Sequence, residues 1–296
     1  MSGTLRALRR RLNSVKTTQK ITRAMKIVAA AKLQSAETRL LSAKPYSELV
    51  AKAIRDIAYR TDPESYPLLA GRSDERVLEV LVVSADRGLC GAFNSSLLRF
   101  AEDYIEDHSK QFEKVQVSYI GRKAQSFFKR GKWTAREGWI NYITGKDDYA
   151  RAVEVADNIL NAFYDRQFDR LHVVYNRFVS RMAHKPCAVE LIPLSAFAGV
   201  ERGSFVEFRF EPNRDEVLRS LLVQAVRSAV FDIFLESFAA EQSARMMAMD
   251  NATRNAEEMI DSLTLTYNRA RQESITKELM DIVNGAEALK RGGVGL

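Results

Sequence analysis

The 296-residue sequence is poor in the side chains that build disulfide frameworks and metal sites. It has two cysteines, Cys90 and Cys187, and three scattered histidines, His108, His172 and His184. Two isolated cysteines exclude a disulfide framework, and neither has the paired Cys/His spacing of a zinc site. We therefore expect no metal and no cofactor. The low cysteine content also favours a reducing compartment.

Long hydrophobic runs, glycine and proline are also scarce. No stretch of 18 consecutive apolar residues occurs, so no segment is expected to span a membrane. The 14 glycines and six prolines avoid residues 4–44 and residues 213–284 completely. Because an interior glycine costs a helix about 1 kcal/mol and a proline about 3 kcal/mol, both stretches predict long helices.

Apolar residues in both stretches recur at alternating spacings of three and four, which is typical of a coiled-coil seam. The N-terminal seam comprises Leu5, Leu8, Leu12, Val15, Met25, Val28, Ala29, Leu33, Ala36 and Leu40. The C-terminal seam comprises Ile260, Leu263, Tyr267, Ala270 and Ser274, after alanines at every fourth residue from Ala244 to Ala256. The two ends are expected to pair antiparallel within one chain. A parallel homodimer is the competing arrangement.

The middle of the chain alternates between strand and helix patterns. Four β-branched, apolar runs predict strands: residues 77–83, 115–120, 171–175 and 188–194. Three stretches predict helices: from caps at residues 94–96 to about 112, residues 123–129, and residues 149–164. The expected fold class is an α/β central domain with a small Rossmann-like sheet, plus a long antiparallel α-helical coiled coil formed by the N- and C-terminal helices.

Four segments are expected along the chain. They are an N-terminal coiled-coil helix over residues 1–60, a linker over 61–75, a globular α/β domain over 76–203, and a C-terminal coiled-coil helix over 204–296 that pairs with 1–60. Charge is uneven among them. Residues 1–45 hold eleven Lys or Arg against one acid, Glu37, a net charge of +10 within a chain of net charge +7. Such a basic segment is typical of an organelle transit peptide, a membrane-surface helix or a nucleic-acid arm. The first is disfavoured because the helical pattern continues far past any cleavage point.

The best position for a catalytic site is the loop over residues 86–91, which follows the first predicted strand. Open α/β sheets bind ligands at the carboxyl ends of their strands. However, the loop matches neither G-x-G-x-x-G nor G-x-x-x-x-G-K-[ST], and Gly88 and Gly91 are better explained by positive φ in a tight turn. Cys90 has no nearby histidine and is expected to be a packed thiol. No group of residues predicts an active site, so the chain is not expected to be an enzyme.

The most specific motifs lie towards the two ends. Residues 17–33 read TTQKITRAMKIVAAAKL, residues 262–272 read SLTLTYNRARQ, and residues 275–288 read ITKELMDIVNGAEA. DRGLCG at residues 86–91, RMMAM at 245–249 and FEP at 210–212 follow the same order. With these motifs the chain resembles the gamma subunit of the F-type, rotary ATP synthase along nearly its whole length. The central part matches more loosely.

This resemblance implies a central-stalk rotor subunit that is not itself catalytic. It would transmit torque between the c-subunit ring and the catalytic head, coupling proton flow to ATP synthesis or hydrolysis. The implied partners are three alpha and three beta subunits, the epsilon subunit and the c ring, with no nucleic acid and with membrane contact only through the complex. An acid-rich lever of the beta subunits would meet the basic rotor surface.

The resemblance also implies roles for individual residues, carried over by motif. The positions expected to meet the beta-subunit lever and catch are Met25, Lys26, Arg87, Cys90, Arg271, Gln272, Thr276 and Glu278. Those expected to form the foot on the c ring are Phe208, Phe210 and Glu211. Without the family, each would be interpreted as seam packing or a solvated charge.

The chain lacks the long cysteine-bearing insertion of thiol-regulated, chloroplast-like gamma subunits. With Met1 and no presequence, we expect a bacterial form, peripheral on the cytoplasmic face of the inner membrane. Two other classes stay open. One is a nucleic-acid-binding coiled coil, although exposed aromatic residues do not interleave with its basic residues. The other is a small α/β enzyme with a helical dimerisation appendage.

Overall fold

The computed structural model describes residues 3–58, 61–133, 135–146, 148–195 and 209–292. The chain divides into two compact units, one of residues 1–27 with 248–296 and the other of residues 28–247. None of the described helices is both long enough and apolar enough to cross a bilayer.

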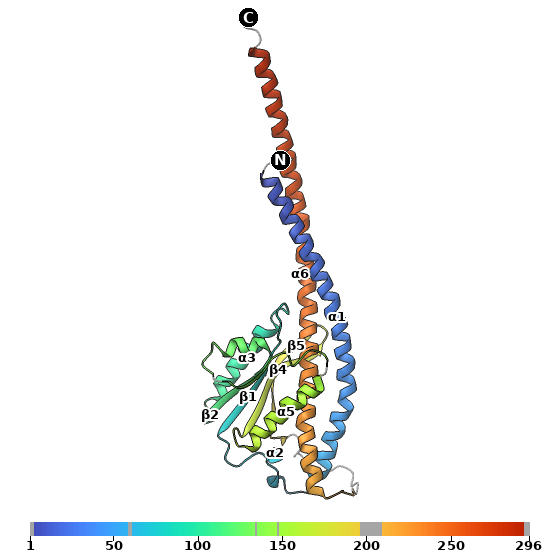
Figure 1. Ribbon diagram of the computed structural model, residues 1–296, viewed down its shortest axis with the longest axis vertical. Coiled ribbons are helices and arrows are strands. Elements are labelled where there is room, and N and C mark those ends of the chain that lie inside the picture. Colours follow the sequence, from blue (N-terminus) through green and yellow to red (C-terminus); the bar gives the residue numbers. More distant parts are fainter. Residues whose placement is uncertain (1–2, 59–60, 134, 147, 196–208, 293–296) are drawn as a thin grey trace. The chain divides into compact units, whose positions relative to one another are not determined.

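Helix α1 (Gly3–Ala58) includes the first stretch that lacks glycine and proline, and α6 (Arg214–Gly292) includes the second from its second residue onwards (Figure 1). The side chain of Asn213 caps α6, because its Oδ1 accepts a hydrogen bond from the Glu216 amide at 2.9 Å. Helix α1 continues through Pro45, and the buried side chains of Val50 and Ile54 stabilise the part beyond it. The long-helix predictions are therefore confirmed.

In the unit of residues 1–27 and 248–296, α1 and α6 pair antiparallel. The hydroxyls of Thr22 and Thr253 lie 2.8 Å apart, and Lys26 Nζ lies 2.5 Å from Asp250 Oδ1. A later residue of α1 thus contacts an earlier residue of α6, which shows that the two helices run in opposite directions. The paired arrangement lies within one chain, as the fold-class prediction required.

The seam residues of this unit have the predicted spacing. On α1 the less exposed side chains are Leu5, Leu8, Leu12, Val15, Gln19, Thr22 and Met25. On α6 they include Met249, Ala252, Ala256, Ile260, Leu263, Tyr267, Ala270 and Ser274. This alternation of threes and fours keeps one face of each helix against the other.

In the unit of residues 28–247, a five-stranded sheet has the order β3-β2-β1-β4-β5. Its strands are β1 (Val77–Val83), β2 (Lys114–Ile120), β3 (Ala135–Trp139), β4 (Arg170–Ser180) and β5 (Ala183–Ile192). The first four are parallel to their neighbours, whereas β5 runs antiparallel to β4. The helices that connect them are α3 (Phe93–His108), α4 (Arg122–Phe128) and α5 (Asp148–Tyr164).

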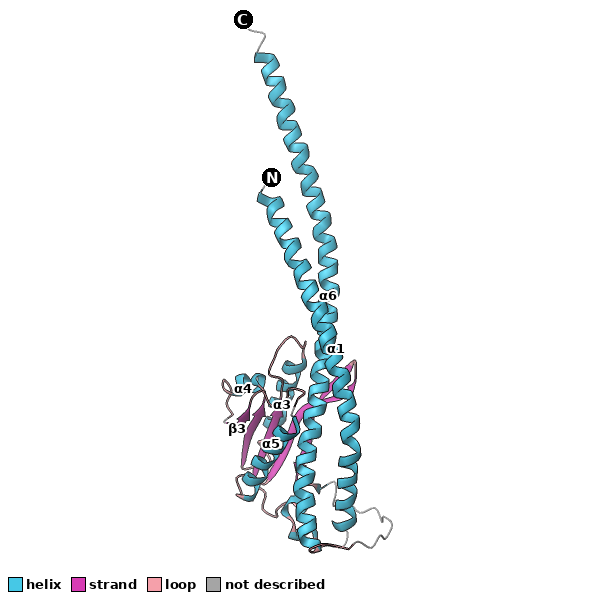
Figure 2. Cartoon of the chain, turned by 45° about the vertical axis from the view of Figure 1, so that its right-hand side comes forward, coloured by secondary structure: helices cyan, strands magenta, loops and turns pink. Residues whose placement is uncertain are grey.

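The two faces of the sheet bury different helices. Leu81, Val83 and Val173 face a core with α5 and the adjacent parts of α1 and α6, whereas Leu78 and Val80 face α3 and α4. In this unit α1 and α6 again lie side by side, and Ser47 Oγ on α1 donates to Asp232 Oδ2 on α6 at 2.6 Å (Figure 2). The Rossmann-like sheet and the long helices confirm the predicted fold class.

Several local predictions were wrong. Strand β3 was not predicted, and β5 begins at Ala183 as half of a hairpin rather than at residue 188. Helix α3 begins at Phe93 with no side-chain cap. Asn94 is used elsewhere, because its Oδ1 accepts the Ala85 amide at 3.0 Å. Positive φ occurs at Gly91, as predicted, but at Leu89 rather than at Gly88. Val28, predicted to lie in the seam, is 55% exposed, because Ala29 beside it takes the buried position.

The predicted linker, residues 61–75, contains the short helices η1 (Pro63–Ser65) and α2 (Pro67–Ala70). Leu68 and Leu69 of α2 are buried in the core beside α5 and α6. The division of the chain at residues 60, 75 and 203 stays a prediction.

Candidate interaction surfaces

Met25 and Lys26 lie in the paired part of α1, and the structure places them differently. Met25 is half-buried in the seam, whereas the Lys26 side chain is 44% exposed and bridges to Asp250 on α6. Asp250 also accepts from Arg254 Nη2 at 2.9 Å. The hydrogen bond from Lys26 is the main cause that lowers the pKa of Asp250. Lys26 thus ties the two helices together while part of its side chain stays in contact with solvent.

The start of α1 presents a cationic surface. Its exposed basic side chains are Arg6, Arg9, Arg10, Arg11, Lys16, Lys20 and Arg23. No acidic residue occurs anywhere in residues 1–27. Because such charges are exposed and of one sign, they suit an acidic partner through contacts that salt would screen.

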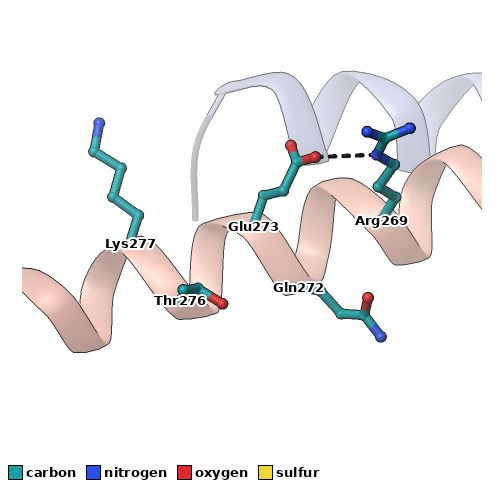
Figure 3. Close-up of a pocket in the computed structure, with 5 residues that line it drawn as sticks. All are labelled: Arg269, Gln272, Glu273, Thr276 and Lys277. Carbon is teal, nitrogen blue, oxygen red and sulfur yellow. Dashed lines mark hydrogen bonds and ion pairs between the residues drawn. The ribbon is translucent and has the colours of Figure 1, made fainter.

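Gln272 and Thr276 line a shallow groove on α6, together with Arg269, Glu273 and Lys277 (Figure 3). Arg269 Nε donates to Glu273 Oε1 at 3.2 Å across one helical turn. The remaining predicted positions of this segment, Arg271 and Glu278, are exposed but do not line the groove. The structure therefore brings two of the four predicted residues into one hollow.

The described side chains of α6 become uniformly exposed after Ser274. Ser274 is half-buried, but every side chain from residue 275 to residue 286 is exposed. The exposed set includes Ile275, Leu279, Met280, Ile282 and Val283. Ile275, Leu279 and Ile282 follow the spacing of one helix face, so this segment carries an apolar row that no described part of the chain covers.

The loop after β1 exposes Arg87 and buries Cys90. The Cys90 side chain is 2% exposed and packs with Ala240 and Ala244 of α6, and its Sγ accepts from Asn94 Nδ2 at 3.2 Å. Burial is the main cause that raises the pKa of the Cys90 thiol. The packed-thiol interpretation is confirmed. Leu89, not singled out from the sequence, is 66% exposed beside Arg87.

Side chains of α6 contact the loop at the carboxyl end of β1, the end at which open α/β sheets usually bind ligands. Arg245 Nη2 donates to the Gly88 carbonyl at 3.2 Å, and Arg245 Nη1 pairs with Glu241 Oε1 at 2.6 Å. Asp86 Oδ1 accepts the amides of Arg122 and Asn141 at 3.1 and 3.0 Å. The loop therefore docks onto a helix of the same chain, and the Asp86 carboxylate and the Gly88 carbonyl are hydrogen-bonded within the fold.

The predicted foot is described in part. Phe208 lies outside the described residues. Phe210 is half-buried, packs on the core formed by α1, α5 and α6, and lies 5.4 Å from the guanidinium carbon of Arg214. Glu211 is exposed immediately before α6. Phe210 thus anchors the start of α6, and Glu211 is the member of the set that is open to a partner.

Comparisons with known proteins identify the family. The family model for ATP synthase matches residues 4–289. An ATP synthase gamma chain of Acidiphilium cryptum is 43% identical over 295 residues, covering 97% of this chain and 100% of the relative. The chain belongs to the ATP synthase gamma chain family. A gamma chain of Syntrophus aciditrophicus is 39% identical over 291 residues, covering 97% and 99% of the two chains.

Solved structures share the gamma chain fold. A chain of the Euglena gracilis mitochondrial ATP synthase in rotational state 3 matches with a TM-score of 0.70 and 22% identity, covering 99% of this chain and 97% of that one. A chain described as part of the rotor of the same assembly, in rotational state 1, matches with a TM-score of 0.66 and 21% identity over 92% and 99%.

Among the described residues, no group of three or more His, Cys, Asp or Glu side chains is arranged to hold a metal ion. Three features were not predicted from the sequence. The exposure of Leu89 depends on the local φ, and the bridge from Lys26 to Asp250 joins residues far apart in the chain, so no spacing identifies either. The Arg245–Glu241 pair has the i,i+4 spacing of one helix, but its contact with the Gly88 carbonyl does not follow from that spacing.

Proposed function

We propose that the chain is the central-stalk rotor subunit of a proton-translocating F-type ATP synthase. It would transmit torque between the membrane c ring and the alpha/beta head and leave catalysis to the beta subunits. Family membership supports this proposal, and so does the use of the word rotor for a structural neighbour. Two long helices that pair in both units of the chain suit mechanical coupling, a conformational form of linkage between sites.

The observation that carries the proposal is the uncovered end of α6. The seam that pairs it with α1 stops at Ser274, yet apolar side chains continue at Ile275, Leu279 and Ile282. An isolated helix of about 12 residues is marginal in water, and an exposed apolar row calls for a covering surface. A ring of three alpha and three beta subunits would supply that cover.

The charge on α1 supports a beta-subunit contact. Met25 and Lys26 lie at the end of a stretch whose basic side chains are exposed, and Arg87 is exposed in a different unit. An acid-rich lever on the beta subunits would meet these cations. Because Cys90 is buried, we assign it the role of holding the loop against α6, so that Arg87 makes the contact.

The remaining assignments follow the same logic. Arg271, Gln272, Thr276 and Glu278 are exposed polar groups able to hydrogen-bond a beta-subunit catch. Glu211, with Phe208 and Phe210, would form the foot on the c ring. The epsilon subunit would bind the same stalk. The complex would hold the chain at the cytoplasmic face of a bacterial inner membrane, as a peripheral subunit.

Native co-purification tests the proposal. The tagged chain should recover alpha, beta and epsilon subunits in a ratio of 3:3:1, as the family resemblance implies. The double variant R271A/Q272A should weaken recovery or slow ATP turnover by about tenfold, the effect of losing roughly 1.4 kcal/mol of contacts. The matched control is N268A/D261A, which removes exposed polar groups at earlier positions of the same helix.

Two results would contradict the proposal. One is recovery of the chain without ATPase subunits. The other is RNA binding that falls steeply with salt, which would favour the basic coiled coil as a nucleic-acid arm. If assembly, ATPase activity and proton pumping were all unchanged in R271A/Q272A, the assigned catch would be wrong while the rotor function stood.

A further inference from the structure

The turn between β4 and β5 reaches both long helices in the unit of residues 28–247. Phe178, near the end of β4, packs with Leu33 and Ala36 of α1 and with Ala239 and Ala240 of α6. We call residues 178–183 the hairpin tip. Its apolar part therefore lies against both helices at once.

A single residue of the hairpin tip also makes polar contacts with both helices. The Arg181 guanidinium binds Glu37 of α1 in a two-pronged contact, with Nη2–Oε2 at 2.6 Å and Nε–Oε1 at 2.9 Å. Its carbonyl accepts a hydrogen bond from Ser243 Oγ of α6 at 2.7 Å. Ser243 is fully buried. Arg181 thus adds a second polar tie between these helices to the direct hydrogen bond from Ser47 to Asp232.

The acid used in this contact is unusual for its position. Glu37 is the only acidic residue among the first 45, in a stretch that otherwise carries eleven cations. Its side chain is 20% exposed and faces the arginine of the hairpin tip. Two residues further along α1, Arg39 pairs with the fully buried Asp148 of α5 at 3.1 Å and donates to the Gly145 carbonyl at 2.8 Å. The α/β domain therefore binds α1 through two neighbouring ion pairs. Helix α1 supplies the carboxylate of one, Glu37, and the guanidinium of the other, Arg39.

We propose that the hairpin tip is a brace that fixes α1 against α6, so that a twist carried by one helix is shared by the other. This rests on the proposed rotor function. Hydrophobic contact is non-directional. A two-pronged guanidinium–carboxylate contact has a defined geometry, so it adds a directional tie that opposes sliding. Arg181 and Glu37 are positioning residues for torque transfer, because they act through the helices and contact no substrate.

Charge reversal tests the brace in two ways. In the purified full chain, R181E should raise amide hydrogen exchange in residues 33–45 of α1 by about fivefold, the upper range for one partly exposed ion pair. In the complete complex, reconstituted in phospholipid vesicles, R181E should lower the ratio of ATP-driven proton pumping to ATP hydrolysis. The swap E37R/R181E restores opposite charges, and both measurements should return towards the wild-type values.

The control is R76E, because Arg76 is similarly exposed and pairs with Asp74 at 2.6 Å, away from both helices. If R181E behaves like R76E, or if exchange rises while the pumping ratio stays unchanged, the brace is wrong and the pair is only a local tie. Failure of the swap to restore the ratio also overturns it. A wild-type complex that assembles without pumping would instead refute the rotor function, and the brace with it.

Discussion

At the scale of single residues, Glu236 on α6 is held in an unfavourable position. Its Oε2 is buried and has no hydrogen-bond partner among the described residues. Burial is the main cause that raises its pKa, and nearby Asp232 raises it further, whereas Tyr175 and Arg177 lower it. The folded pKa exceeds the unfolded value of about 4.3. Below pH 4.3 the carboxyl group is therefore neutral in both states, and its contribution to the stability of the fold is fully present. It is lost as the pH rises through the raised pKa.

We therefore expect E236Q to increase the free energy of unfolding by about 1 kcal/mol at pH 8, and by much less at pH 4. Urea denaturation followed by circular dichroism at the two pH values measures this difference. The control E258Q changes an exposed glutamate of the same helix and should have no such pH dependence. Equal effects of E236Q at both pH values would show that ionisation of Glu236 does not matter.

Gly121 is required by the turn between β2 and α4. Its φ is +95°, and a Cβ there would lie 2.3 Å from the Ser84 carbonyl oxygen. We expect G121A to cost about 3 kcal/mol of unfolding free energy, because strain and a backbone clash add. The control is G131A, where φ is not positive and the nearest atom would lie at 3.6 Å. Similar denaturation midpoints for both variants would contradict the expectation.

Whether the environment of a residue can be predicted depends on how far along the chain its partners lie. The seam position of Met25 follows from local spacing, so the sequence predicts it. The buried ion pair of Glu79 on β1 with Arg136 on β3, at 2.7 Å, does not follow from any spacing. Glu79 interrupts an apolar strand, which signals a partner, but the partner lies on a strand that the sequence did not reveal.

At the scale of elements, strength of pattern decided what could be predicted. The long helices are marked by absent glycine and proline, and β1 is marked by β-branched residues. Strand β3 reads Ala-Arg-Glu-Gly-Trp, has little β-branched character, and exists because it pairs beside β2. Tertiary pairing outweighed propensity there. For the same reason, Asn94 bonds to the β1–α3 loop instead of capping α3.

The uncovered end of α6 predicts a gradient of protection. In the purified chain, amides of residues 275–286 should exchange much faster than those of residues 256–270, because no described side chain of the end segment is buried. Hydrogen-exchange mass spectrometry measures this, and in the assembled complex the difference should shrink. Equal protection of the two segments in the isolated chain would contradict an unpaired end.

At the scale of the whole molecule, the net charge of +7 conceals a strongly basic start. We expect association with the alpha and beta subunits to slow by about tenfold between 50 and 500 mM salt, because steering between opposite charges is screened. Stopped-flow fluorescence measures the rate. The triple variant R9Q/R10Q/R11Q should show a shallower dependence, whereas K110Q, on the α/β domain, should leave it unchanged. An association rate independent of salt would remove the role of this surface.

The alternation of threes and fours along the paired helices has a consequence for length. Two turns of such a helix repeat the same face after seven residues, so removing seven residues from each partner at matched heights would shorten the pair without rotating its outer surfaces. Removing four residues would rotate every outward-facing side chain beyond the deletion to a new direction about the helix axis. Reach and orientation are therefore separable properties of this molecule, and evolution or a protein engineer can adjust one while keeping the other.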